Sequence, residues 1–300
     1  MTNSARVGFI GVGNMGRAMA LRLCELGWTV GVRDVVAARE AECVRAGAKA
    51  HATPADLAAA HPLVVVAVVD AAQCDAVLFG ADGWLHGAPA GDGCVVLCPT
   101  LGPASTEAIA ARLNERDIGC IDAPMSGGPA RASDGSMSLM VACADALFER
   151  HRALLEALST KLFRIGERPG DGARTKLVNN LLAAINLAGA AEAIALAERL
   201  GLDLARTLDV IEQSSGQSWI GSDRMRRAIA GDLAPRAHTT LLAKDSRLAL
   251  EMAEAAGIDP SLGRVAAGHF AAASAAGFGP LDDASLLVWL RGLDAASARG

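Results

Sequence analysis

Three closely spaced glycines near the start of the chain constrain the fold more than any other feature. They follow an apolar stretch at residues 6–10, which predicts a short buried strand, and they open a stretch at residues 17–26 that predicts a helix. In this setting the first glycine permits a tight turn, the second lets the backbone approach a pyrophosphate, and the third lets helix and strand pack closely. An ordinary βαβ unit with glycine turns is the weaker alternative to dinucleotide binding by the motif Gly11-Val12-Gly13-Asn14-Met15-Gly16.

A second predicted strand, at residues 29–34, ends in an acidic residue. Asp34 stands eighteen positions after Gly16, where a carboxylate can accept hydrogen bonds from the adenosine ribose hydroxyls. The same carboxylate would repel a 2′-phosphate, so NAD is favoured over NADP as the cofactor. Arg33 works in the opposite direction, because a neighbouring guanidinium could pair with that phosphate.

Helix and strand patterns continue to alternate after Asp34. A helix is predicted at residues 37–46, and apolar runs predict strands at residues 63–69, 94–97 and 119–122. Such uninterrupted apolar runs between helices are typical of a parallel sheet that is covered on both faces. Ligands bind at the carboxyl ends of the strands in such sheets. The residues just past these ends are Asp70, Pro99, Thr100, Pro124 and Ser126.

The composition is that of a compact soluble protein. Of the 300 residues 52% are hydrophobic and 20% are charged, and the formal net charge is −5. No run of Lys and Arg stands out, so nucleic acid is not expected as a partner. The seven cysteines have no CxxC or Cys/His spacing, which indicates reduced thiols and no metal site. We expect no signal peptide, no association with a membrane and a cytoplasmic location.

The longest predicted helix covers about residues 172–200 and ends before Gly201, where a left-handed residue would close it. At 1.5 Å per residue it is ~43 Å long, which suits an element joining two domains or two subunits. Lys176 and Asn180 are four positions apart and share one face. A lysine sunk in an apolar cleft can exchange a proton near neutral pH. The alternative is a lysine whose stem packs while its ammonium reaches water.

A second unusual stretch contains Ser126, Gly127 and Gly128. A Ser-Gly-Gly turn presents successive backbone N–H groups and a hydroxyl, which together can hold a small carboxylate. A plain glycine turn between two strands is an equally open interpretation of these residues taken alone.

Four motifs stand out along the chain. They are Gly11-Val12-Gly13-Asn14-Met15-Gly16, Asp122-Ala123-Pro124-Met125-Ser126-Gly127-Gly128, Gly170-Asp171-Gly172-Ala173-Arg174-Thr175-Lys176-Leu177-Val178-Asn179-Asn180 and Lys244-Asp245. Taken together they resemble the β-hydroxyacid dehydrogenase family, which includes 3-hydroxyisobutyrate dehydrogenase, tartronate semialdehyde reductase and threonate dehydrogenase. The resemblance covers residues 7–291. Within the family, the loops at residues 128–132, 214–219 and 273–279 are most similar to the threonate branch.

The resemblance implies a role for each matching position. Lys176 corresponds to the family's catalytic lysine and Asn180 to its companion beside the substrate, so both are expected catalytic residues. The substrate is expected to contact Asn180 and the carboxylate loop of Ser126, Gly127 and Gly128. The expected cofactor-binding residues are Gly11, Val12, Gly13, Asn14, Met15, Gly16, Asp34, Val69, Thr100 and Lys244.

Two positions depart from the family's pattern. The usual Leu-Pro after the fourth strand is Val69-Asp70 in this chain, and the usual Ser-Thr is Pro99-Thr100. These departures concern the surroundings of the nicotinamide and not the overall assignment.

The expected architecture is an α/β Rossmann-type N-terminal domain, residues 1–166, and an all-α C-terminal domain, residues 167–300, joined by the long helix. Helices in the second domain are predicted to end at Gly257, Gly277 and Gly292. An apolar helix of this length exceeds what a small domain can cover, so a homodimer or homotetramer is expected.

The expected function is transfer of a hydride between NAD and the hydroxyl carbon of a small hydroxyacid, which is the EC 1.1.1 class of oxidoreductase. The substrate is expected to be 3-hydroxyisobutyrate-like, tartronate semialdehyde/glycerate-like or threonate-like. One alternative is an oxidative decarboxylase resembling 6-phosphogluconate dehydrogenase, but those enzymes place a Glu seven residues after the lysine, where this chain has Ala183. The other is a non-catalytic dinucleotide-binding module, which would be expected to have lost Lys176.

Overall fold

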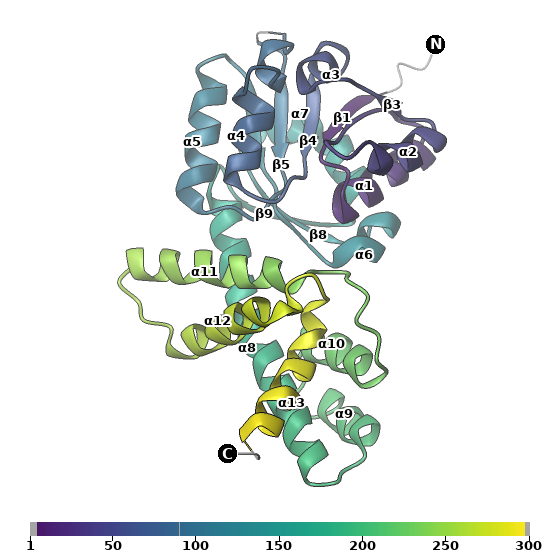
Figure 1. Ribbon diagram of the computed structural model, residues 1–300. Coiled ribbons are helices and arrows are strands. Elements are labelled where there is room, and N and C mark those ends of the chain that lie inside the picture. Colours follow the sequence, from purple (N-terminus) through teal and green to yellow (C-terminus); the bar gives the residue numbers. More distant parts are fainter. Residues whose placement is uncertain (1–4, 90, 298–300) are drawn as a thin grey trace. The chain divides into compact units, whose positions relative to one another are not determined.

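The computed structural model describes residues 5–89 and 91–297, with the side chains of residues 293–297 excepted. The chain forms two compact units that divide after Lys176. The first is an α/β unit and the second is helical (Figure 1).

The first unit is built on one sheet. The described residues form nine strands in the spatial order β3-β2-β1-β4-β5-β6-β8-β7, with β9 also paired to β8. Neighbours from β3 to β6 are parallel, β8 is antiparallel to β6 and β7, and β9 is parallel to β8. The strands are β1 (Arg6–Ile10), β2 (Thr29–Arg33), β3 (Lys49–Ala50), β4 (Leu63–Val66), β5 (Cys94–Leu97), β6 (Gly119–Asp122), β7 (Met125–Ser126), β8 (Ser138–Ala142) and β9 (Lys161–Gly166).

Helices cover both faces of this sheet, as the uninterrupted apolar strands predicted. Successive side chains of a strand point to opposite faces, so Val65 belongs to one apolar core and Val64 and Val66 to another. Helices α1 (Asn14–Glu25), α6 (Gly128–Asp134) and α7 (Asp145–Leu158) contribute to the first core. The second core contains residues of α3 (Pro54–Ala60), α4 (Ala71–Phe79), the short helix η1 (Trp84–His86) and α5 (Pro103–Asn114), while α2 (Ala37–Arg45) follows β2.

The strand predicted at residues 63–69 is shorter than expected, because it ends at Val66. Asp70 stops it. The Asp70 carboxylate accepts the N–H of Gln73 at 2.8 Å and so caps α4, which starts one residue later. The departure from the family's Leu-Pro pattern therefore has a local structural reason at Asp70.

Two buried histidines pack together beside β2. The rings of His51 and His61 are 5.4 Å apart in an edge-to-face arrangement, and the two residues are 9% and 3% exposed. A side chain at Gly31 would lie 2.5 Å from the His61 ring, so glycine is needed on the strand there. Nδ1 of His61 and Nε2 of His51 have no hydrogen-bond partner among the described residues. Burial is the main cause that lowers the pKa of His61, and together with the nearby His51, Arg6 and Lys49 it brings the value to about 4.

The second unit is helical. Its described residues contain no β-strand, only one isolated β-bridge between His238 and Asp282. The prediction that a helix ends at Gly292 is wrong, because the last helix continues past it to Ser297. The elements after α8 are α9 (Leu204–Glu212), α10 (Trp219–Ile229), α11 (Thr239–Ala255), α12 (Ser261–Ala273), the π-helical turn η2 (Ser274–Phe278), the short helix η3 (Asp283–Ser285) and α13 (Leu286–Ser297).

Helix α8 (Asp171–Arg199) is the long helix that the sequence predicted. Gly201 closes it with a φ of 70°, and the N–H of Leu202 bonds back to the carbonyl of Ala197. By length and composition α8 is the one helix of the described chain that could cross a membrane. It is a core helix instead, because Leu187 and Ile194 are fully buried in the apolar core of the second unit.

Candidate functional site

The glycine loop has the geometry that a dinucleotide-binding turn requires. Gly11 has a φ of 87°, and a side chain there would lie 2.8 Å from the carbonyl oxygen of Ala67. A side chain at Gly16 would lie 2.0 Å from the carbonyl oxygen of Gly11, so only glycine lets α1 approach the strand. No atom lies within 4 Å of a side chain built at Gly13, which leaves open space above the backbone at the start of α1. This loop fits a pyrophosphate held at a helix N-terminus.

Asp34 is held against this loop. Its Oδ2 accepts the N–H of Val12 at 2.8 Å, and its Oδ1 accepts the N–H of Val36 at 2.9 Å. The residue is only 6% exposed. Asp34, the residue predicted to bind the ribose, therefore lies beside the glycine motif and directly after β2.

The residues assigned to the substrate carboxylate form a turn between β7 and α6. Gly127 and Gly128 have φ values of 133° and 76°, which favour glycine at both positions. No atom lies within 4 Å of a side chain built at Gly128, whereas one at Gly127 would lie 2.9 Å from Arg131. Ser126, the last residue of β7, pairs with Ser138 of β8. The turn thus has open space beside its backbone, as an anion-binding loop needs.

The first residue of the same motif holds the start of α8. Oδ2 of Asp122 accepts the N–H of Gly170 at 2.7 Å and that of Ala173 at 3.0 Å. A side chain at Gly172 would lie 2.6 Å from the carbonyl oxygen of Met140, so the helix start sits directly on the sheet. Asp122 is 2% exposed, and burial raises its pKa to about 6 although these hydrogen bonds lower it. Lys176 follows three residues after Ala173 on the same helix.

Lys176 and Asn180 both lie on α8 and both are buried, with 7% and 8% of their surfaces exposed. The exposed fraction of Lys176 fits a desolvated lysine better than one whose ammonium projects into bulk water.

In the helical unit, Asn180 belongs to a polar cluster. Its Nδ2 donates to Oδ2 of Asp245 at 2.7 Å, and its Oδ1 accepts from Nδ2 of Asn179 at 3.1 Å. Nζ of Lys244 lies 3.2 Å from the other oxygen of Asp245. Asp245 is 7% exposed and connects two of the predicted site residues, Asn180 and Lys244. In the sequence, Asp245 stands out only as part of the Lys244-Asp245 motif, because its neighbours in α11 are polar as well.

The remaining predicted cofactor residues follow β4 and β5. Val69 is 47% exposed, and its N–H donates to Oε1 of Gln73 at 3.1 Å. Thr100 is half-buried just past β5. Both lie beyond the carboxyl ends of parallel strands, which is the edge where ligands bind in such sheets.

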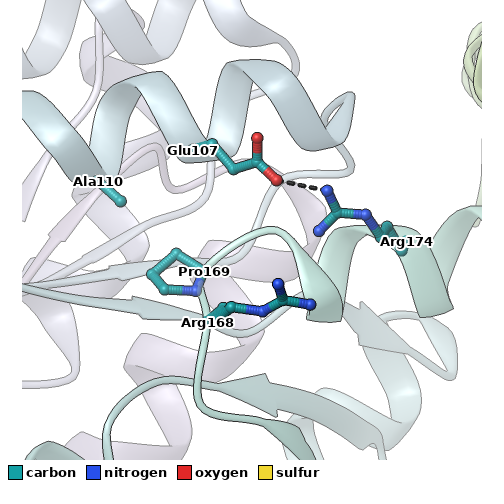
Figure 2. A pocket seen from close by; sticks show the side chains of 5 residues that line it. All are labelled: Glu107, Ala110, Arg168, Pro169 and Arg174. Carbon is teal, nitrogen blue, oxygen red and sulfur yellow. Dashed lines mark hydrogen bonds and ion pairs between the residues drawn. The ribbon is translucent and has the colours of Figure 1, made fainter.

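A separate cavity of about 370 Å³ lies between α5 and the start of α8 (Figure 2). It contains none of the residues predicted for the site. Arg174 pairs with Glu107 across it, and Arg168 lies 3.5 Å from Asp171, so the charges of both arginines are compensated. The lining residues are Glu107, Ala110, Arg168, Pro169 and Arg174.

Comparison with known proteins agrees with the geometry. Residues 6–166 match the family model described as the NAD binding domain of 6-phosphogluconate dehydrogenase. Residues 170–290 match the model described as NAD-binding of NADP-dependent 3-hydroxyisobutyrate dehydrogenase. L-Threonate dehydrogenase of Escherichia coli (strain K12) is 34% identical over 98% of this chain and 97% of its own length. The chain belongs to the β-hydroxyacid dehydrogenase family.

Solved structures support the assignment over nearly the whole chain. The crystal structure of 3-hydroxyisobutyrate dehydrogenase from Salmonella typhimurium superposes with a TM-score of 0.88 at 34% identity, over 95% of this chain and 99% of that one. The structure of Psf3 in complex with NADP+ and 2-OPP has the same TM-score at 27% identity, over 95% and 99% of the two chains. The protein is an NAD(P)-dependent hydroxyacid dehydrogenase of the EC 1.1.1 class, in a family of soluble enzymes. The predicted family, fold class and reaction are confirmed.

Proposed function

We propose that this dehydrogenase prefers NAD and acts on a short polyhydroxy acid of the threonate type, with Lys176 as its acid/base. The observation that carries the catalytic part is a buried lysine one helical turn from Asn180, whose amide is fixed by Asp245. The substrate class rests on the L-threonate dehydrogenases and on the loop similarities to that branch. The preference for NAD rests on Asp34 at the glycine loop.

Each residue has a defined task in this mechanism. The bound nicotinamide supplies the hydride chemistry. Ser126, Gly127 and Gly128 bind the substrate carboxylate through backbone N–H groups and the hydroxyl. Lys176 in its neutral form takes the proton of the substrate hydroxyl during oxidation and returns it, as an ammonium, during reduction. Asn180 donates a hydrogen bond to the substrate hydroxyl or orients the lysine.

Further residues are assigned to the cofactor. The glycine loop from Gly11 to Gly16 holds the pyrophosphate and Asp34 the adenosine ribose. Val69, Thr100 and Lys244 contact the nicotinamide half.

The test of the catalytic role is Lys176→Ala. Loss of a positioned acid/base lowers kcat by roughly 10² to 10⁴, and NADH binding should change little because the dinucleotide is assigned to other residues. Lys176→Arg should restore little activity, since a guanidinium does not release its proton near neutral pH. A Lys176→Ala enzyme that keeps more than about a tenth of wild-type kcat would contradict the role. The substrate class is tested by a panel of threonate, 3-hydroxyisobutyrate, glycerate and serine, each assayed with NAD and with NADP.

A homodimer or homotetramer is part of the proposal. Exposed apolar side chains lie on α8 and α12 in the second unit. These helices are neighbours, because Gly263 of α12 lies against Leu181 of α8. An unpaired apolar surface of this kind favours association with a second copy. Sedimentation across a concentration series tests it, because a monomer at all concentrations would refute it. The side chains are Val178, Leu182, Leu262 and Val265, which are 59–69% exposed.

Two further expectations belong to this proposal. We place the domain boundary at residues 166/167, and the matched ranges, which end at 166 and resume at 170, support that division. The compact units divide ten residues later, within α8. We also place the enzyme in the cytoplasm, which its cysteine content supports. Fractionation of cells that carry a tagged chain tests the location.

A further inference from the structure

The corner of the sheet after β2 contains a second buried carboxylate, to which the proposed function assigns no role. Glu40 lies on α2, and the residue is 9% exposed. Its Oε1 accepts the N–H of Asp34 at 2.6 Å and lies 3.4 Å from Nη1 of Arg33. A carboxylate is buried at a cost unless it is paired and hydrogen-bonded. Both residues that contact Glu40 bear on the choice of cofactor: the Asp34 carboxylate favours a ribose hydroxyl, and the Arg33 guanidinium favours a 2′-phosphate.

The guanidinium of Arg33 makes two contacts through one nitrogen. Its Nη1 donates to the carbonyl oxygen of Asp34 at 2.6 Å as well as to Glu40. The side chain is 28% exposed, whereas that of Arg39, which lies 3.7 Å from Asp34, is 54% exposed. A guanidinium recognises phosphate through free N–H groups and a net positive charge. Glu40 compensates that charge and occupies one of those groups.

We propose that Glu40 is a specificity-determining residue for the cofactor. It holds Arg33 against the backbone and fixes Asp34 where its carboxylate meets the N–H of Val12, so this corner accepts a ribose hydroxyl and rejects a 2′-phosphate. The inference rests on the proposed preference for NAD. It adds the reason why the arginine beside Asp34 does not reverse that preference.

The charges at this corner are balanced. Asp34 and Glu40 place two carboxylates at this corner, and Arg33 and Arg39 are the cations paired with them. A 2′-phosphate would add about two negative charges to a region that is already compensated. Removing the charge of Glu40 leaves one carboxylate and two arginines. We expect that change to favour NADPH by roughly tenfold relative to NADH.

Glu40→Gln tests this directly. The glutamine oxygen can still accept the N–H of Asp34, so the turn keeps its hydrogen bond while the charge is lost. The dissociation constants of NADH and NADPH are measured by fluorescence titration without substrate, so that the result does not depend on turnover. The matched control is Glu42→Gln on the same helix, where the carboxylate pairs with Arg17 and is 44% exposed. It makes the same change in net charge and should move the NADH/NADPH ratio by less than about twofold.

Arg33→Ala provides the second arm. In the wild-type background it should leave the dissociation constant of NADPH within about twofold, because Glu40 already engages the guanidinium. In the Glu40→Gln background it should remove the gain. A loss of NADPH affinity of more than about fivefold on Arg33→Ala alone would mean that Arg33 already serves the phosphate, and would overturn the proposal.

The outcomes separate this inference from the proposed function. A wild-type protein that binds neither nucleotide refutes the proposed function, and one that prefers NADPH refutes the cofactor preference together with the role of Glu40. A wild type that prefers NADH, combined with an unchanged ratio in Glu40→Gln or an equal shift in Glu42→Gln, overturns the inference alone.

Discussion

Acidification should destabilise the first unit through His61. The ring is buried beside Gly31 with no partner for Nδ1 among the described residues, and its pKa is lowered to about 4. In the unfolded chain the imidazole titrates near its ordinary value of 6.5. The folded protein therefore binds a proton less readily than the unfolded one. The contribution of the neutral His61 ring to the free energy of unfolding is complete above pH 6.5 and is lost progressively as the pH falls towards 4.

The size of the effect follows from the two pKa values. With 6.5 in the unfolded state and about 4 in the folded state, His61 costs about 2 kcal/mol of unfolding free energy at pH 5 relative to pH 8. Charges inside a protein are screened more strongly than in a dry medium, so we expect about 1–2 kcal/mol. His61→Gln removes the titrating group. The variant should be less stable than the wild type at pH 8, because the packed ring is lost, and the deficit should shrink by that amount at pH 5.

Urea unfolding at pH 8, 6.5 and 5 measures the effect, with tryptophan fluorescence as the signal, because Trp84 is fully buried in the first unit. His86→Gln is the matched control, since His86 is exposed and its loss should not change the pH dependence. A difference between wild type and His61→Gln that stays constant within 0.5 kcal/mol from pH 8 to pH 5 would refute the reasoning. The ring would then accept its proton as easily in the fold as in the unfolded chain.

Three further predictions concern the site. The pKa of Asp122 is raised in the folded state, so its charged form destabilises the fold above pH 6 and this penalty fades as the pH falls. The stability of Asp122→Asn relative to wild type should therefore rise by about 1 kcal/mol between pH 5 and pH 8. A difference in urea unfolding that does not change with pH would contradict this. Asp245→Ala releases the amide of Asn180, so kcat/KM should fall roughly tenfold, the equivalent of one hydrogen bond to a charged group. An unchanged kcat/KM in steady-state assays would show that Asn180 does not need the hydrogen bond to Asp245. Leu182→Glu places a charge on the exposed apolar side of α8 and should convert the proposed oligomer to monomers in sedimentation, whereas Glu192→Gln on the same helix should not.

The sequence was most informative where the signal is local. The glycine loop, the apolar strands and Gly201 each depend on neighbouring residues, and their positions agree with the structure to within a few residues. The errors are local too: β4 ends at Val66, before the predicted end at residue 69, and Gly292 lies inside α13 without ending it. A single exposed glycine weakens a helix by only about 1 kcal/mol, which neighbouring packed residues offset.

The polar contacts that support the site were not predictable from the sequence. Asp122 meets Gly170 across 48 positions and Asn180 meets Asp245 across 65. No periodicity in a single sequence links residues so far apart, because such pairs form only when the sheet and the helices are assembled. Four strands, β3, β7, β8 and β9, were also missed. For β3 and β7 the reason is their length, since strands of two residues carry too few side chains to show an alternation.

The cysteines have a practical consequence for experiments on this enzyme. Six of the seven are buried in the first unit and the seventh, Cys24, is half-buried. Burial raises the pKa of Cys43 to about 11 and that of Cys98 to about 12, and it raises the pKa of Cys24, Cys94, Cys120 and Cys143 as well. Because the thiolate is the reactive form, maleimide dyes at neutral pH should leave these thiols almost unmodified. A single cysteine introduced at an exposed position, such as Val210→Cys on α9, could therefore be labelled selectively without first replacing the native ones.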